Sequence, residues 1–229
     1  MQPNFQAIAQ PAQVSLAANR VLRNTYAMLG LTMIPTVIGA AVGVSTNFSF
    51  LAQYPIMGPL LMLAAMMGLM FAVGATRNSV WSIPLLLLFT FVMGWWLGPM
   101  LQYALRLSNG AQLVGLAAGG TGLTFLTLAG IATVTRKDFS FLGKFLMVGL
   151  VLLVVASIAN LFFAVPAVSL TISAVAVLVF SGYILYDVSD IVRGGETNYV
   201  MATLRIYLDI YNLFVALLNL LLAFAGNRE

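Results

Sequence analysis

Long runs of apolar residues are the feature that most limits what this chain of 229 residues can fold into. A helix needs roughly 20 apolar residues to cross a bilayer, and seven segments meet that requirement. They cover residues 24–44, 54–75, 80–104, 111–134, 145–163, 168–186 and 206–225. Strands of outer-membrane barrels alternate apolar and polar residues over about 10 positions, whereas these runs do not alternate. The sequence therefore predicts an all-α membrane protein with seven transmembrane helices.

The composition excludes several functional classes. Hydrophobic residues make up 62% of the chain and charged residues only 7%, whereas soluble domains carry about 25% charged residues. The chain has no Cys and no His, which removes thiol nucleophiles, Ser-His triads and imidazole metal ligands. We therefore expect a protein that is not an enzyme, with no resident cofactor and no nucleic-acid partner. A pH response near neutrality would have to come from carboxyl groups or from a partner.

The distribution of Lys and Arg between the connections predicts the orientation in the membrane. Short cytoplasmic loops are enriched in these residues. One side would hold eight of them: Arg20, Arg23, Arg77, Arg136, Lys137, Lys144, Arg193 and Arg205. The other side would hold only Arg106 and Arg228. We therefore predict a cytoplasmic N-terminal tail over residues 1–20, a membrane domain over 21–229, and a C-terminus outside.

Small residues and prolines mark the expected packing of the spans. Three Gly-x-x-x-Gly pairs are present: Gly39 with Gly43, Gly94 with Gly98, and Gly115 with Gly119. Such pairs let helix backbones approach closely in lipid, and we expect ordinary packing within the chain. Pro35 and Pro84 fall inside predicted spans and are candidates for kinks.

A stripe of polar and small residues follows one face of the last span. Its members recur at steps of four, three, four, three and four: Arg205, Asp209, Asn212, Ala216, Asn219 and Ala223. Residues three and four apart share a helix face, and a polar face avoids lipid. The stripe is either a hydrogen-bonded packing face or a path for ions or protons. On the second alternative, Arg205, Asn212 and Asn219 would line the path.

Two acids stand out as a candidate sensor. Asp209 is the only charged residue inside the seven predicted spans, and Asp187 directly follows the sixth. Both would lie near the cytoplasmic ends of consecutive antiparallel helices, where they could meet. Two close carboxyl groups cannot readily both ionise in a low-dielectric site, so they would share a proton. Arg77 could pair with Asp187, and Asp190 is expected to be a solvated loop acid near Arg193.

Several separated segments carry a family resemblance. They are Gly194-Gly195-Glu196-Thr197-Asn198-Tyr199, residues 204–214 from Leu204 to Phe214, Tyr183-Ile184-Leu185-Tyr186-Asp187, residues 135–142, and Val21-Leu22-Arg23-Asn24-Thr25-Tyr26. Together they resemble the Bax inhibitor-1 family, also called the transmembrane Bax inhibitor motif family. The first and last of these segments look especially like its bacterial, YccA-like branch. The resemblance covers nearly the whole chain after the tail.

The resemblance implies a fold, a site and an activity. In this family the last of seven helices is central and is surrounded by the other six. Members have been assigned a pH-sensitive calcium leak, whose di-aspartyl proton sensor would correspond to Asp187 and Asp209. Calcium would bind these two carboxylates only weakly and transiently, because it prefers six to eight oxygen ligands. Arg77 lies close to the position of the family's basic latch on the second helix.

The resemblance also implies a second function. The YccA-like branch is associated with the membrane AAA protease FtsH, so the alternative is a non-transporting modulator or binding partner of that protease complex. The tail over residues 1–20 would be the candidate contact. On either alternative the expected location is the bacterial inner membrane, and the expected partners are the bilayer, protons and calcium ions or the protease.

Overall fold

The computed structural model describes residues 11–226, and every regular element in that range is a helix. The helices are α1 (Pro11–Ser45), α2 (Ser49–Gln53), α3 (Met57–Ala75), α4 (Ser82–Trp96), α5 (Gly98–Leu105), α6 (Gly110–Thr135), α7 (Leu142–Phe163), α8 (Pro166–Val192) and α9 (Tyr199–Gly226). Seven segments of the described residues are long and apolar enough to cross a membrane, with α4 and α5 together forming the third. The prediction of an all-α protein with seven transmembrane helices is confirmed.

Three boundaries differ from the sequence prediction. The tail was predicted to extend to residue 20, but residues 11–20 already form the start of α1, and residues 1–10 lie outside the described range. The helix α8 continues to Val192 and α9 begins at Tyr199, so the connection between them is shorter than predicted. The helices extend beyond the long apolar runs into segments that include charged and polar residues, and hydropathy alone does not detect this.

The prolines act at helix ends more than within spans. Pro99 is the second residue of α5, and the third predicted span is interrupted just before it, at Leu97. A proline there lacks an N–H and its ring crowds the carbonyl four residues back, which ends α4. Pro84 is the third residue of α4, in the first turn, where a helix tolerates a missing N–H. Pro35 lies inside α1.

Two of the Gly-x-x-x-Gly pairs face each other where α1 crosses α4 and the first residue of α5. A Cβ on Gly39 would clash with the carbonyl oxygen of Phe91, and one on Gly94 would clash with that of Thr36. A Cβ on Gly98 would lie 2.5 Å from the carbonyl oxygen of Gly43. The expected packing within the chain is therefore present at these two pairs. Gly115 and Gly119 of α6, in contrast, have no atom of a neighbouring element within 4 Å of where a Cβ would lie.

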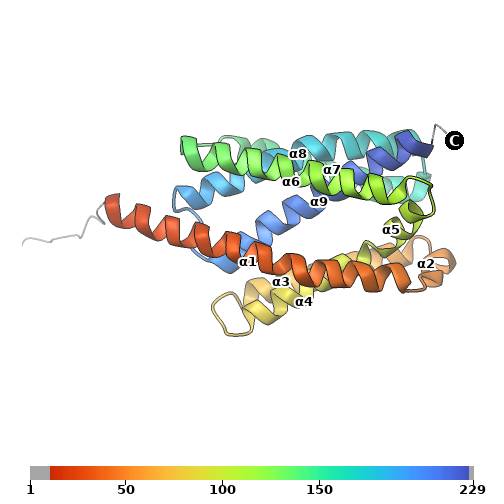
Figure 1. The fold of residues 1–229 in the computed structure, drawn as a ribbon, viewed down its shortest axis with the longest axis horizontal. Helices are drawn as coiled ribbons and strands as arrows, with labels where there is room; N and C mark the ends of the chain where they lie inside the picture. Colours follow the sequence, from red (N-terminus) through yellow and green to blue (C-terminus); the bar gives the residue numbers. More distant parts are fainter. Residues whose placement is uncertain (1–10, 227–229) are drawn as a thin grey trace, which may run out of the picture.

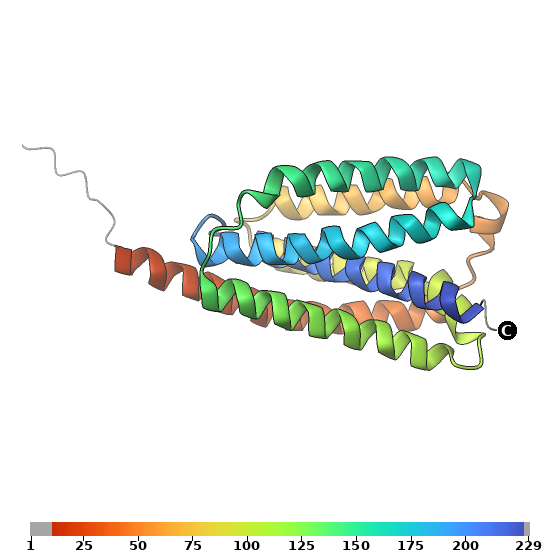
Figure 2. The same ribbon diagram turned by 90° about the horizontal axis from the view of Figure 1, so that it is seen from above.

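The last helix runs obliquely between two layers of helices. Figure 1 shows α1, α3 and α4 on one side of α9 and α6, α7 and α8 on the other, and Figure 2 shows the same bundle from above. The main neighbours of α9 are α8, α6 and α1, with a smaller contact to α4. The hydroxyl of Tyr207 is hydrogen bonded to Thr36 Oγ1 at 2.9 Å, and that of Tyr211 donates to the carbonyl oxygen of Met93 at 3.0 Å. These bonds fix one face of α9 against α1 and α4.

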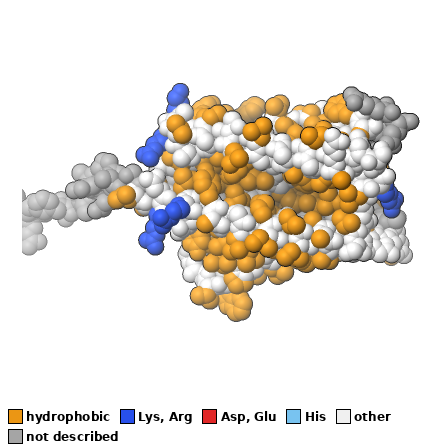
Figure 3. Space-filling view, in the orientation of Figure 1, with side chains coloured by type: hydrophobic (Ala, Val, Ile, Leu, Met, Phe, Trp, Pro, Cys, Tyr) orange, Lys and Arg blue, Asp and Glu red, His pale blue; other side chains and the backbone are white. Residues whose placement is uncertain are grey.

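Charged side chains gather at the ends of the bundle. Figure 3 shows an apolar band between Lys and Arg side chains at the two ends. We call the end at which α3 and α8 finish and α9 begins the basic end, since it carries Arg77, Arg193 and Arg205 as well as Lys137. Arg106 lies at the opposite end, after α5. All the candidate site acids lie in the half of the bundle nearest the basic end.

Candidate functional site

Asp187 and Asp209 meet between two antiparallel helices. Asp187 lies five residues before the end of α8, and Asp209 lies ten residues, or about 15 Å, into α9. Their side chains are within hydrogen-bonding reach of each other. Asp187 is 7% exposed and Asp209 is 5% exposed. The structure therefore brings together the two acids that the sequence singled out, and both belong to helix interiors.

The pair has a polar atom without a partner. Oδ2 of Asp209 is buried and has no hydrogen-bond partner among the described residues. A buried carboxylate oxygen without a donor is costly, and two ionised carboxylates at this separation would repel each other strongly. One proton shared between the two groups removes this repulsion. The geometry is therefore suited to a group whose charge changes with proton binding.

Arg205 is held by two other acids. Its guanidinium donates Nη1 to Asp190 Oδ2 at 3.4 Å and places Nη2 3.2 Å from Glu196 Oε2. Asp190 is part of α8, and Arg193 instead pairs with Asp138 at 2.9 Å, so the prediction of a loop acid near Arg193 was wrong. The cause is the longer α8, which carries Asp190 round to the side facing α9. Arg205 therefore fastens the start of α9 to the end of α8, one turn from Asp209.

Arg77 lies away from the acid pair. It follows α3 in the connection to α4, its side chain is exposed, and it forms none of the ion pairs among the described residues. Its main-chain carbonyl oxygen accepts a hydrogen bond from Asn198 Nδ2 at 2.9 Å. Arg77 thus contacts the α8–α9 region through its main-chain carbonyl oxygen.

The polar stripe of α9 contacts α8 along its length. Asn219 Nδ2 donates to Ser173 Oγ at 3.3 Å, and Ala216 packs in a cluster with residues of α7 and α8. Asn212 Nδ2 donates to the carbonyl oxygen of Leu208 within its own helix at 2.8 Å. These contacts are those of a packing face, which was one of the two alternatives for the stripe. Asp209 is the stripe member that pairs with another titratable group in the interior.

A matching stripe on α8 was missed by the sequence reasoning. Its members recur at steps of three, four, three, four and three: Ser173, Ala176, Phe180, Tyr183, Asp187 and Asp190. Three of its members meet the stripe of α9 in antiparallel order, with Ser173 at Asn219, Asp187 at Asp209 and Asp190 at Arg205. The same periodicity that identified the stripe on α9 would have found this one.

Metal-binding groups are sparse in the site. The described part of the chain contains no group of three or more His, Cys, Asp or Glu side chains placed to hold a metal ion. Asp187 and Asp209 alone offer fewer oxygens than the six to eight that calcium prefers. These two carboxyl groups alone therefore fall short of a tight calcium site.

Comparison with known proteins decides the family. A family model described as "Inhibitor of apoptosis-promoting Bax1" matches residues 18–226. The chain belongs to the Bax inhibitor-1 family. It is 41% identical over 206 residues to a protein of Escherichia coli K12 named modulator of FtsH protease YccA, covering 90% of this chain and 91% of that one. An uncharacterized protein of Neisseria meningitidis serogroup B is 42% identical over 214 residues, covering 93% and 94%. An uncharacterized membrane protein of Vibrio cholerae is 41% identical over 207 residues, covering 90% and 91%.

In this Bax inhibitor-1 family member, the run 194–199 shapes the short turn between α8 and α9. Gly194 has a φ of 81°, a left-handed conformation that favours glycine. A Cβ on Gly195 would clash with Asp190 Oδ1, so the second glycine lets the turn fold against α8. Glu196 Oε1 accepts from the N–H of Asn198 at 2.8 Å while its other oxygen faces Arg205. The turn is therefore held by the same residues that surround the acid pair.

Asn198 is a site residue that sequence reasoning did not single out. Its Oδ1 accepts from the N–H groups of Val200 and Met201 at 3.0 and 3.1 Å, which caps the first turn of α9. Its Nδ2 donates to the carbonyl oxygen of Arg77 and, at 3.2 Å, to Asn78 Oδ1. One side chain thus joins the start of α9 to the α3–α4 connection. An Asn directly before an apolar helical run is a recognised N-cap signal that could have identified it.

The connection between α6 and α7 is tied to the same end. Ser189 Oγ donates to the carbonyl oxygen of Lys137 at 2.9 Å, and Arg193 pairs with Asp138. Asp138 Oδ1 also accepts from the N–H of Ser140 at 2.8 Å. The hydrogen bonds from Ser140, together with the nearby charge of Arg193, hold the pKa of Asp138 below its ordinary value. Three connections at the basic end are therefore joined around the α8–α9 pair.

Proposed function

We propose that this protein is a proton-sensitive cation leak, with calcium as the permeant ion and Asp187 with Asp209 as the sensor. The observation that carries the proposal is the contact of these two buried carboxyl groups between α8 and α9. An ionisable residue within a membrane span is costly and is therefore a functional candidate by default. Here two of them lie together in a chain that has no His.

The proposed mechanism uses a change of charge at one helix contact. With one proton shared, the pair holds α8 and α9 together through a hydrogen bond. When that proton leaves, two negative charges face each other in a low-dielectric environment and favour separation of the helices. A change at this contact also reaches Arg205, which lies one turn away and joins both helices through Asp190. Weak coordination by two carboxylates suits an ion that must leave as well as enter.

The proposed location is the bacterial inner membrane, with the basic end in the cytoplasm. The bias of Lys and Arg toward that end supports the orientation, because cytoplasmic loops are enriched in these residues. Support for the location comes from a second YccA relative in Escherichia coli, which is named inner membrane protein. Labelling of single cysteines introduced at Arg106 and at Arg136 from either side of the membrane tests the orientation. Labelling of the Arg136 position from the periplasm would contradict it.

Calcium flux into proteoliposomes tests the leak. We expect flux in the wild type to depend on pH, and Asp187→Asn and Asp209→Asn each to abolish that dependence while the protein remains folded. Asp138→Asn is the matched control, since it removes an equal charge from an exposed acid at the same end. Flux no greater than in empty liposomes, or pH-dependent flux retained in Asp209→Asn, would contradict the proposal.

A second candidate function is modulation of the membrane protease FtsH. The observation that favours it is the name of the Escherichia coli relative, a modulator of FtsH protease. On this proposal the N-terminal segment is the contact, and ion passage is not required. Because α1 begins at Pro11, deletion of residues 2–10 leaves every described helix whole.

Co-purification with FtsH and the lifetime of the protein in cells test this second proposal. We expect deletion of residues 2–10 to reduce both binding and turnover by the protease. A variant with residues 2–10 in scrambled order controls for the length of the segment. Equal binding and turnover in the wild type and the deletion variant would contradict a role for this segment.

A further inference from the structure

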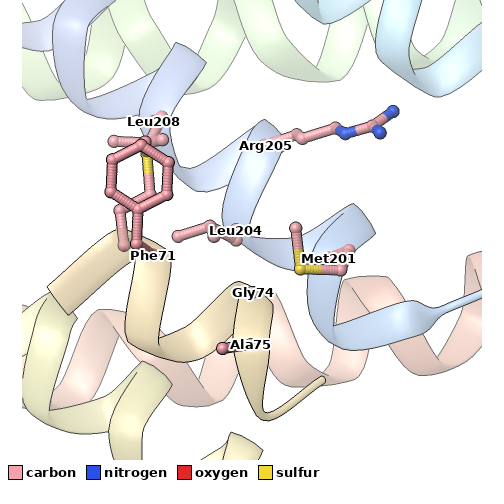
Figure 4. A pocket seen from close by; sticks show the side chains of 8 residues that line it. Phe71, Gly74, Ala75, Met201, Leu204, Arg205 and Leu208 are labelled. Atoms are coloured by element: carbon pink, nitrogen blue, oxygen red, sulfur yellow. The ribbon is translucent and has the colours of Figure 1, made fainter. Parts of the chain in front are cut away.

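A cavity of about 530 Å³ separates α3 from α9 at the basic end. It is lined by Met70, Phe71, Gly74 and Ala75 of α3 and by Met201, Leu204, Arg205 and Leu208 of α9. Figure 4 shows the apolar side chains gathered on one side, with the guanidinium of Arg205 directed away from them. That guanidinium is engaged by Asp190 and Glu196, so Arg205 contributes mainly its hydrocarbon stem to the wall.

The space exists because α3 is packed mainly against α4 and approaches α9 with small residues. A Cβ on Gly74 would meet only the terminal methyl of Met201, at 4.0 Å. The lining residues belong to membrane-spanning segments. Phe71 at its edge is exposed, on a surface that faces the hydrocarbon of the bilayer. The cavity is therefore an apolar recess at membrane depth.

Water and ions are poor occupants of this recess. Empty apolar cavities stay dry, because a water molecule needs two to four polar partners. A hydrocarbon chain has no hydrogen bonds to lose when it enters such a recess. Flexible Met side chains such as Met70 and Met201 adapt to ligands of variable shape. The volume also falls within the range of about 300–1,000 Å³ that is usual for small-molecule sites.

A cationic residue follows the lining residues of α3 in the chain. Arg77 follows Ala75 by two residues, is exposed, and forms no ion pair with any described residue. Arginine is suited to phosphate, because its fork of N–H groups matches phosphate oxygens. An apolar recess lined by Ala75, followed two residues along the chain by a guanidinium without an ion pair among the described residues, matches the two parts of a phospholipid.

We propose that the cavity between α3 and α9 binds one phospholipid, with an acyl chain against Gly74 and the phosphate at Arg77. The lipid would fill the space between two helices that do not pack closely here, and would hold α3 beside the start of α9. This site is separate from the acid pair and does not depend on the protein passing ions.

Native mass spectrometry of the delipidated protein, titrated with phosphatidylglycerol in detergent, tests the proposal. We expect the wild type to bind one phosphatidylglycerol molecule per chain with saturation. Gly74→Leu would fill the recess and weaken this binding by at least about tenfold, since several buried methylene contacts are lost. Ala75→Leu, which fills the same recess from the next residue, serves as a second variant. Gly68→Leu is the matched control, because Gly68 lies on the same helix and no atom comes within 4 Å of where its Cβ would lie.

The phosphate contact has its own variant. Arg77→Gln should weaken binding several-fold and remove most of its dependence on salt concentration. Unchanged binding in Arg77→Gln would overturn the assignment of the phosphate to Arg77. Absence of a saturable phospholipid in the wild type, or equal binding by Gly74→Leu and Gly68→Leu, would overturn the site as a whole.

Discussion

Asn198 donates a hydrogen bond from its side chain to the main-chain carbonyl oxygen of Arg77, across 2.9 Å. The same side chain caps α9, whose stripe carries Asp209. Because the acceptor is a backbone atom, the contact survives any change of side chain at position 77. The start of α9 is therefore joined to the α3–α4 connection by a residue that precedes the helix.

Substitutions of Asn198 separate its two roles. Asn198→Asp keeps the capping oxygen but loses the amide donor to Arg77, whereas Asn198→Ala loses both. We expect Asn198→Ala to be less stable than the wild type by about 1–3 kcal/mol, with Asn198→Asp intermediate. Equilibrium unfolding in detergent measures this order. Equal stability of Asn198→Asp and the wild type would show that the contact with Arg77 contributes nothing.

The glycine crossing of α1 and α4 predicts a sharp difference between two similar substitutions. Gly94→Ala places a methyl group against the carbonyl oxygen of Thr36, a backbone atom that cannot rotate away. We expect a loss of about 1–3 kcal/mol or more from this overpacking. Gly115→Ala meets no neighbouring element and should be neutral, or stabilising by up to about 1 kcal/mol. The midpoints of thermal unfolding of the two purified variants test this difference. Similar midpoints would contradict this description of the crossing.

Substitution of Asn219 tests whether the stripe on α9 is a packing face or a path for ions. As a packing residue, Asn219 should show a coupling energy with Ser173 of about 0.6 kcal/mol in a double-mutant cycle with alanine substitutions. Calcium flux per folded protein should then be the same in Asn219→Ala and the wild type. A large change in flux without measurable coupling would instead favour the path alternative.

The lowered pKa of Asp138 predicts that the stability of the folded protein decreases slightly in acid. Its pKa is lowered in the folded protein, so its contribution to stability is present above its ordinary pKa of 3.8 and is lost as pH falls through the lowered folded value. Asp138→Asn should therefore resemble the wild type in strong acid and be slightly less stable near neutrality. Thermal midpoints measured from acid to neutral pH check this. A midpoint difference that grows as the pH falls would contradict the sign.

Much of the fold follows from the sequence because bilayer hydrocarbon imposes a length and a composition on each span. The apolar runs located all seven spans, but they ended the sixth one at residue 186, before Asp187 and Asp190. Those acids are helical because each has a partner on α9 or in the adjoining turn. A local measure of hydropathy contains no information about such partners.

The candidate site could be predicted from the sequence only in part. The spacing on α9 and the position of Asp187 sufficed to propose the acid pair. The partners of Arg205 did not follow from spacing, since Glu196 reaches it only through a turn that depends on the left-handed Gly194. The hydrogen bond from Asn198 to Arg77 involves a main-chain carbonyl, which sequence patterns do not specify.

The central claim is that Asp187 and Asp209 share a proton, and infrared difference spectroscopy measures this most directly. We predict that the wild type in liposomes near neutral pH shows a protonated carboxyl band that disappears as pH rises. The band should shift in frequency in both Asp187→Asn and Asp209→Asn, because each removes one of the two carboxyl groups that share the proton, and it should be unchanged in the control Asp138→Asn. A wild type without a protonated carboxyl at neutral pH, or a band that is unchanged in both variants of the pair, would contradict the account.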